Sequence, residues 1–219
     1  MKLRERELEK LTANIVVLSG AEATISVSAD EIAPILKDPT VQVLGQPAQQ
    51  LQLMSLRDQI KVSIGGGRFI FEDESNDVPP RLRLPDVVQA FIRLFATKGV
   101  TEFRAYGFNF DIAFDASGDS PAAQVILERF VKSEQLERRG GITPQGSGLR
   151  LYFSMGEASC DLRIEPHENK VNSPRFFSHI NYHYDLPDGQ FPQADALKAD
   201  FQGKWGIFED LLERLVLQP

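Results

Sequence analysis

The polar residues Asn109 and Asp111 are the first candidates for chemistry in this chain. They lie in Phe103–Phe114, where large apolar residues alternate with small or polar ones. Successive side chains of a strand point to opposite faces, so Asn109 and Asp111 share a face with Gly107. A carboxylate and an amide above a small residue would suit the floor of a ligand cleft or an acid–base site. The interpretation we favour is that a helix packs closely on this face, with Asp111 at the rim of the sheet.

Two histidines supply the next candidates. His179 and His183 share a face of the predicted strand Phe176–Asp185. Four residues of strand separate them by roughly 13 Å at ~3.3 Å per residue, which is too far for one metal ion to bind both. We therefore predict no metal site and no cofactor, and we expect both histidines to be exposed. With Asn109 and Asp111 they are the weak candidates for catalysis.

An arginine pair is the candidate for ligand binding. If Gly156-Glu157 is a two-residue hairpin turn, Arg150 faces Arg163 across the hairpin. Two opposed guanidiniums could hold an anionic group bidentately. The alternative, which we favour, is that the neighbouring Asp161 neutralises both.

The same hairpin gives an internal test of its register. Each apolar residue of one strand then faces an apolar residue of the other: Met155 with Ala158, Phe153 with Cys160, Leu151 with Leu162 and Leu149 with Ile164. A shift of one residue would destroy this match. Cys160 is thus predicted to be buried, where a thiol without a basic neighbour is not an activated nucleophile.

No other motif indicates catalysis. The sequence has no Gly-x-Ser-x-Gly elbow, and the glycines at 65–67 and 146–148 precede strands rather than helices, so we interpret them as turns. We therefore predict no catalytic residues beyond the weak candidates above. The question of whether the protein is an enzyme stays open.

Charge and composition limit the classes of partner that we expect. Of 219 residues, 31 are acidic and 24 basic, and the net charge of -7 repels phosphate backbones and anionic lipid. We expect no nucleic-acid binding. A single cysteine fits a reducing cytoplasm, and the N-terminal segment offers neither a signal-peptide core nor a membrane span.

The elements that must position these residues indicate an α+β fold. A meander of strand-like runs over 51–71, the long strand at 103–114, the hairpin and the strand at 176–185 predict a largely antiparallel sheet. Apolar spacing predicts three covering helices at 85–98, 121–138 and 204–217. Residues 1–219 form a single domain or two tightly associated halves, with a possible hinge at 72–84. In the long strand, Arg104 falls on the aromatic face with Tyr106, Phe108 and Phe110.

The run Tyr106-Gly-Phe-Asn-Phe110, with a helix and meander before it and a hairpin and aromatic helix after it, resembles a family of uncharacterised prokaryotic proteins. The similarity concerns the order of elements from about residue 40 onward. It implies bacterial or archaeal origin and an α+β fold, and it carries over no functional residue.

Two classes of function follow. The leading hypothesis is a non-catalytic cytoplasmic protein that binds a partner or assembles as a homodimer, because three helices would leave part of the aromatic strand face uncovered. The alternative is a small-ligand-binding protein or hydrolytic enzyme with a cleft between sheet and helices. In the second case the polar candidates should converge in one cavity.

Overall fold

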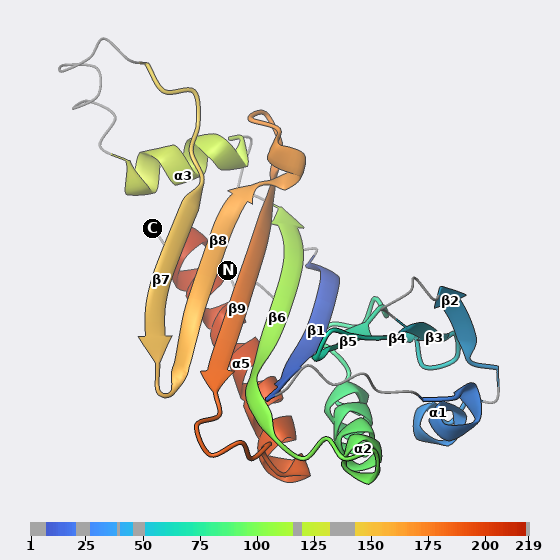
Figure 1. Cartoon of the computed structure of the whole chain (residues 1–219). Helices are drawn as coiled ribbons and strands as arrows, with labels where there is room; N and C mark the ends of the chain where they lie inside the picture. Colours follow the sequence, from blue (N-terminus) through green and yellow to red (C-terminus); the bar gives the residue numbers. More distant parts are fainter. Residues whose placement is uncertain are drawn as a thin grey trace.

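One antiparallel sheet organises the chain. The computed structural model describes residues 8–20, 27–38, 40–45, 51–115, 120–131 and 143–217. In this part of the chain nine strands pair in the order β2-β3-β4-β5-β1-β6-β9-β8-β7 (Figure 1). The strands are β1 Glu9–Ser19, β2 Gln42–Gly45, β3 Leu51–Ser55, β4 Ile60–Gly65, β5 Arg68–Asp73, β6 Phe103–Asp115, β7 Leu149–Met155, β8 Ala158–Pro166 and β9 Arg175–Asp185.

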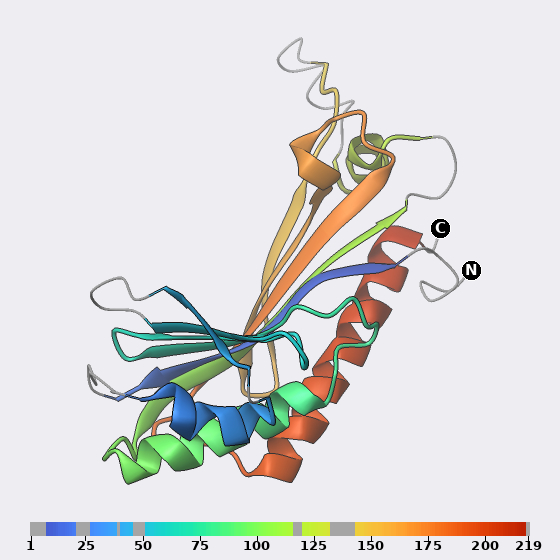
Figure 2. The same ribbon diagram turned by 90° about the vertical axis from the view of Figure 1, so that its right-hand side faces the viewer.

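The main helices lie on one side of this sheet (Figure 2). They are α1 (Ala29–Leu36), α2 (Arg83–Thr97) and α5 (Ala194–Leu212), and α5 continues into a short π-helical turn, η3 (Glu213–Leu217). A further helix, α3 (Ala122–Phe130), packs near β8 at one end of the sheet, and η2 (His167–Asn169) is a single 3₁₀ turn. This is the predicted α+β fold with a largely antiparallel sheet, and the prediction is confirmed.

The central strand β6 has one fully buried aromatic face. Phe108 and Phe110 have no exposed surface, and the ring of Phe110 lies 5.2 Å from Phe201 and 5.3 Å from Trp205 of α5, centroid to centroid. Such edge-to-face and tilted contacts add to the stabilisation from burial. The helices therefore cover the aromatic face that we expected to be left over, because α5 begins ten residues before the predicted start at 204. The expected reason for dimerisation is thus removed, while the homodimer itself stays a prediction.

The extra length of α5 follows from one continuous apolar stripe. Leu197 and Phe201 extend the spacing of Trp205, Phe208 and Leu212, and all five are buried. The end of the helix predicted at 121–138 also differs from the structure. Described helix α3 ends at Phe130, after which Val131 is extended, and the rest of the predicted span to 138 lies outside the described residues.

The predicted hairpin is present in the predicted register. Met155 pairs with Ala158, Phe153 with Cys160 and Arg150 with Arg163. Gly156 takes the positive φ of 61° that the first central position of a type II′ turn requires. Cys160 is buried, and this burial raises the pKa of its thiol.

A buried ion pair fixes the segment after β5, where we predicted a possible hinge. A bulge between Lys10 and Thr12 turns Lys10 toward the helix side of the sheet, where its Nζ lies 2.8 Å from the Asp73 carboxylate. That carboxylate also accepts hydrogen bonds from the backbone N–H groups of Ser75 and Arg81. Burial lowers the pKa of Lys10. Burial alone would raise the pKa of Asp73, but its donors outweigh that effect and lower it.

Replacing Lys10 by Met should cost about 3 kcal/mol of unfolding free energy, because it leaves a buried carboxylate without its cation. Urea denaturation measures the loss. The matched control is Lys61→Met, which breaks a partly exposed pair with Glu72 and should cost less than about 1 kcal/mol. Equal losses in the two variants would contradict this account.

The same pair predicts an acid dependence. Asp73 has a folded pKa below its unfolded value near 3.9, so its stabilising contribution is complete above about pH 5 and is lost as the pH falls through the folded value. The stability difference between the wild type and Asp73→Asn should therefore shrink as the pH falls below about 4.

Candidate functional site

The face of the sheet opposite α1, α2 and α5 carries a row of asparagines. Asn14, Asn109 and Asn181 lie side by side on β1, β6 and β9. The Asn109 amide donates to Asn14 Oδ1 at 2.7 Å, and the Asn181 amide donates to Asn109 Oδ1 at 2.6 Å. None of the described helices covers this face, so our expectation of a helix packed on it is wrong (Figure 2). The row is a continuous polar chain across three strands.

A second row runs parallel to the first. Thr12 Oγ1 donates to Asp111 Oδ2 at 2.9 Å, and Asp111 Oδ1 lies 2.5 Å from His179 Nδ1. The carboxylate thus bridges β1 and β9 from its place on β6. His179 is about three-quarters buried in this arrangement. Asp111 thus contacts Nδ1 of the His179 ring and orients the ring. The second ring nitrogen, Nε2, takes no part in this contact.

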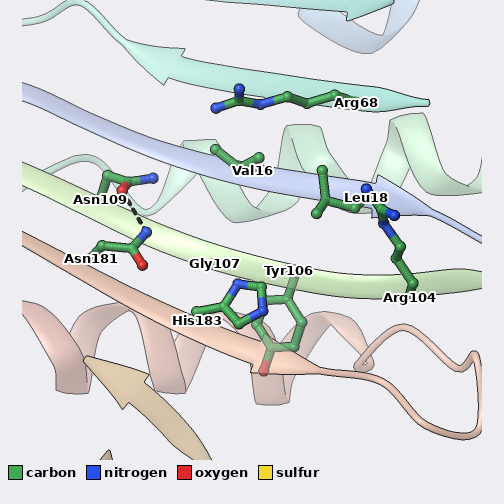
Figure 3. A pocket seen from close by; sticks show the side chains of 9 residues that line it. All are labelled: Val16, Leu18, Arg68, Arg104, Tyr106, Gly107, Asn109, Asn181 and His183. Atoms are coloured by element: carbon green, nitrogen blue, oxygen red, sulfur yellow. Dashed lines mark hydrogen bonds between the residues drawn. The ribbon is translucent and has the colours of Figure 1, made fainter. Parts of the chain in front are cut away.

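Next to the asparagine row the sheet is hollowed into a cavity of about 370 Å³ (Figure 3). Its lining residues are Val16, Leu18, Arg68, Arg104, Tyr106, Gly107, Asn109, Asn181 and His183. Two of these are arginines and none is an Asp or Glu. Both arginine side chains are exposed, and neither guanidinium forms an ion pair or hydrogen bond with any residue that the structure describes. The lining is thus positively charged in a chain of net charge -7.

Two local features deliver the arginines to this cavity. Leu18 pairs with Ala105 while Ser19 pairs with Phe103, so Arg104 is the extra residue of a β-bulge. A bulge turns the side chain of the extra residue out of the regular alternation. Arg104 therefore lies at the cavity rather than on the aromatic face, where we predicted it. The reason is the one-residue insertion in β6, which a strict period of two cannot show.

Arg68 comes from the opposite side. It begins β5, directly after the turn at Gly66 and Gly67, both with positive φ, and it pairs with Leu18 of β1. The glycine run at 65–67 is thus a turn, as we interpreted it. What the sequence did not reveal is that β1 lies between β5 and β6, which places Arg68 and Arg104 on the two strands that flank β1.

Gly107 lines the cavity at a point where β6 and β9 approach closely. A Cβ atom at this position would lie 2.6 Å from the Tyr182 carbonyl oxygen of β9, closer than real Cβ contacts allow. The neighbouring Tyr106 side chain turns to the helix side, where its ring stacks on Tyr184 with centroids 4.6 Å apart. Burial raises the pKa of Tyr106, so its hydroxyl stays neutral.

The predicted candidates are thus divided among three places. Asn109 and His183 line the cavity, whereas Asp111 and His179 form the adjacent row. The remaining candidates, Arg150 and Arg163, lie at Asp161. The Arg150 guanidinium donates to the Asp161 carboxylate from Nε at 2.9 Å and from Nη2 at 2.7 Å.

Asp161 is shared by both arginines of the hairpin. Arg163 Nη2 lies 3.4 Å from the same carboxylate, and the hydrogen bonds from Arg150 hold the pKa of Asp161 below its usual range. In this arrangement the two guanidiniums do not form an open anion clamp.

Comparisons with known proteins give no family. No family model and no curated protein matches the chain. Among solved structures, a TBP of Methanococcus jannaschii is similar with a TM-score of 0.35 and 10% identity, over 93% of this chain and 99% of that chain. A likeness at this level carries no argument about function. Within the described ranges, no helix is long and apolar enough to cross a membrane, and no three potential metal ligands cluster.

Replacing Gly107 by Ala should destabilise the protein by about 1–3 kcal/mol, because β6 and β9 must separate to admit the methyl group. Chemical denaturation measures the effect. The control is Gly203→Ala in α5, where an added Cβ meets nothing and the gain in helix propensity should stabilise by about 0.5–1 kcal/mol. The account fails if both alanine variants are as stable as the wild type.

Proposed function

We propose that this protein binds a small organic anion in the cavity on the open face of its sheet. The observation that carries the proposal is the lining itself: two arginine side chains without a carboxylate partner among the described residues, at a cavity without any acidic residue. Unpaired guanidiniums in a concave site are suited to carboxylate or phosphate groups, which they bind bidentately.

The other lining residues narrow the ligand. Asn109 and Asn181 bring amide groups, and His183 brings an imidazole to the same wall. Val16 and Leu18 supply apolar surface beside them (Figure 3). A volume of about 370 Å³ lies at the lower end of the range for small-molecule sites. The ligand we infer has one carboxylate or phosphate group and a small body of mixed polarity.

A small anion fits this face better than a polyanion does. Outside the cavity the face carries carboxylates at Asp111, Asp161 and Asp185, and a nucleic-acid backbone laid across the strands would approach them. The Asp185 carboxylate lies 3.2 Å from His183 Nε2 at the margin of the cavity, so we place the anionic group of the ligand at Arg68 and Arg104 rather than at His183. The lack of nucleic-acid binding, the cytoplasmic location and the prokaryotic origin stay predictions.

Binding without catalysis is the form of the proposal that the geometry supports best. The acid–base pair Asp111 and His179 lies outside the cavity lining, and both groups already hydrogen bond to each other. The cavity also opens on the face away from the helices, not between sheet and helices as our alternative hypothesis placed it. Its polar candidates Asn109 and His183 nonetheless share it, which supports ligand binding over a purely protein-binding role.

Isothermal titration with inorganic phosphate and with succinate tests the proposal. Wild-type protein should bind at least one of these probes, and Arg68→Gln and Arg104→Gln should each weaken binding about tenfold or more, since each loses a charge-assisted pair. Arg68→Lys and Arg104→Lys keep the charge but lose the planar fork, so they should recover only part of the affinity.

The matched control is Arg93→Gln on the exposed side of α2, which should leave binding unchanged. Chemical-shift changes in the amide spectrum should map to β1, β6 and β9 in the wild type. The proposal is overturned if neither probe binds, or if binding persists in the Arg68→Gln/Arg104→Gln double variant.

A further inference from the structure

The two edges of the sheet differ in how they are protected. At one edge, β2 has four residues and an irregular register against β3, both of which discourage further pairing. At the other edge, β7 has seven residues in unbroken register with β8. It contains no proline and no lysine, and Arg150 is its only charged residue, so few of the usual devices that protect an edge are present.

The side chains of β7 are also incompletely covered. Those on the helix side, Leu149, Leu151, Phe153 and Met155, pack against the core but remain partly exposed. On the other side Tyr152 is 69% exposed. Both faces of this edge strand thus present apolar surface to solvent.

The backbone of β7 can also pair with a further strand. In a two-residue hairpin the pair that closes the turn, here Met155 and Ala158, is a hydrogen-bonded pair, and such pairs alternate along the ladder. The intervening residues Arg150, Tyr152 and Ser154 therefore direct their N–H and C=O groups away from β8. A row of such groups is a template for another strand.

We propose that β7 pairs with β7 of a second copy of this chain, antiparallel and about a two-fold axis near Tyr152. In that register Leu149 and Leu151 face Met155 and Phe153 of the second copy, and Tyr152 faces its own equivalent. Every apolar position meets an apolar position because apolar residues alternate along the whole of β7 and are placed symmetrically about Tyr152. A two-fold pairing needs just such a self-complementary edge.

Charge favours a second copy as the occupant. Arg150 is the only charged residue of β7, and Asp161 already neutralises it within the same chain. In the proposed register Arg150 faces Ser154 of the second copy, so no like charges are opposed. The anion cavity involves β1, β5, β6 and β9, and the dimer therefore neither requires nor blocks it.

Charge substitutions at position 152 test this pairing. Sedimentation velocity of the wild type over concentrations from about 1 to 100 μM should show a monomer–dimer equilibrium. Tyr152→Glu places two carboxylates opposite each other and should raise the dimer dissociation constant about tenfold or more. Tyr152→Lys should act alike, and an equimolar mixture of the two variants should restore dimerisation.

The control places the same change at the other edge. Gln42→Glu on β2 should leave the dimer dissociation constant unchanged, and circular dichroism should show that all variants are folded. A monomeric wild type at about 100 μM overturns the proposal. It is equally overturned if Tyr152→Glu dimerises as tightly as the wild type, or if the Glu and Lys variants do not associate with each other.

Discussion

The alternation of side chains along β6 is the constraint on which the rest of the structure depends. The pleat places its large aromatic residues on one side, and their burial requires a helix layer there, which α5 supplies. The other side of the same strand is left with Gly107, Asn109 and Asp111. A covered face and an open face are therefore two consequences of one sequence pattern, and the positions of Asn109 and Asp111 follow from them.

Polar groups on the open face largely satisfy one another. The asparagine row and the Thr12–Asp111–His179 row each join β1, β6 and β9 through side-chain hydrogen bonds. Part-buried amides and carboxylates need such partners, since a buried polar group without a hydrogen bond costs free energy. Arg68 and Arg104 are exposed and have no such partner among the described residues, as is also true of Arg93 on α2, but only Arg68 and Arg104 share a cavity whose lining has no acidic residue. The anion that we propose as the ligand would supply a partner for both guanidiniums.

The alternation of apolar and polar residues along the strands predicted much of this fold. It did not predict the places where the alternation is interrupted. The register of the β7–β8 hairpin followed from matching apolar residues across a two-residue turn. Arg104 was placed on the wrong face because a single inserted residue reverses the alternation without any mark in the sequence. Arg68 escaped notice for another reason. Its approach to Arg104 depends on strand order, a long-range property that local spacing does not encode.

The width of the sheet explains why one edge is left half covered. Nine strands at ~4.8 Å spacing span about 38 Å, whereas three neighbouring helices about 10 Å wide cover about 30 Å. The helix layer begins with α1, continues through α2 and reaches α5, and α3 adds cover only near β8 at one end of the sheet, so the shortfall lies at the far edge, where β7 is. Its apolar side chains are therefore only partly buried for a geometric reason. Continuing the sheet into a second copy would remove that edge altogether, as closure does in barrels.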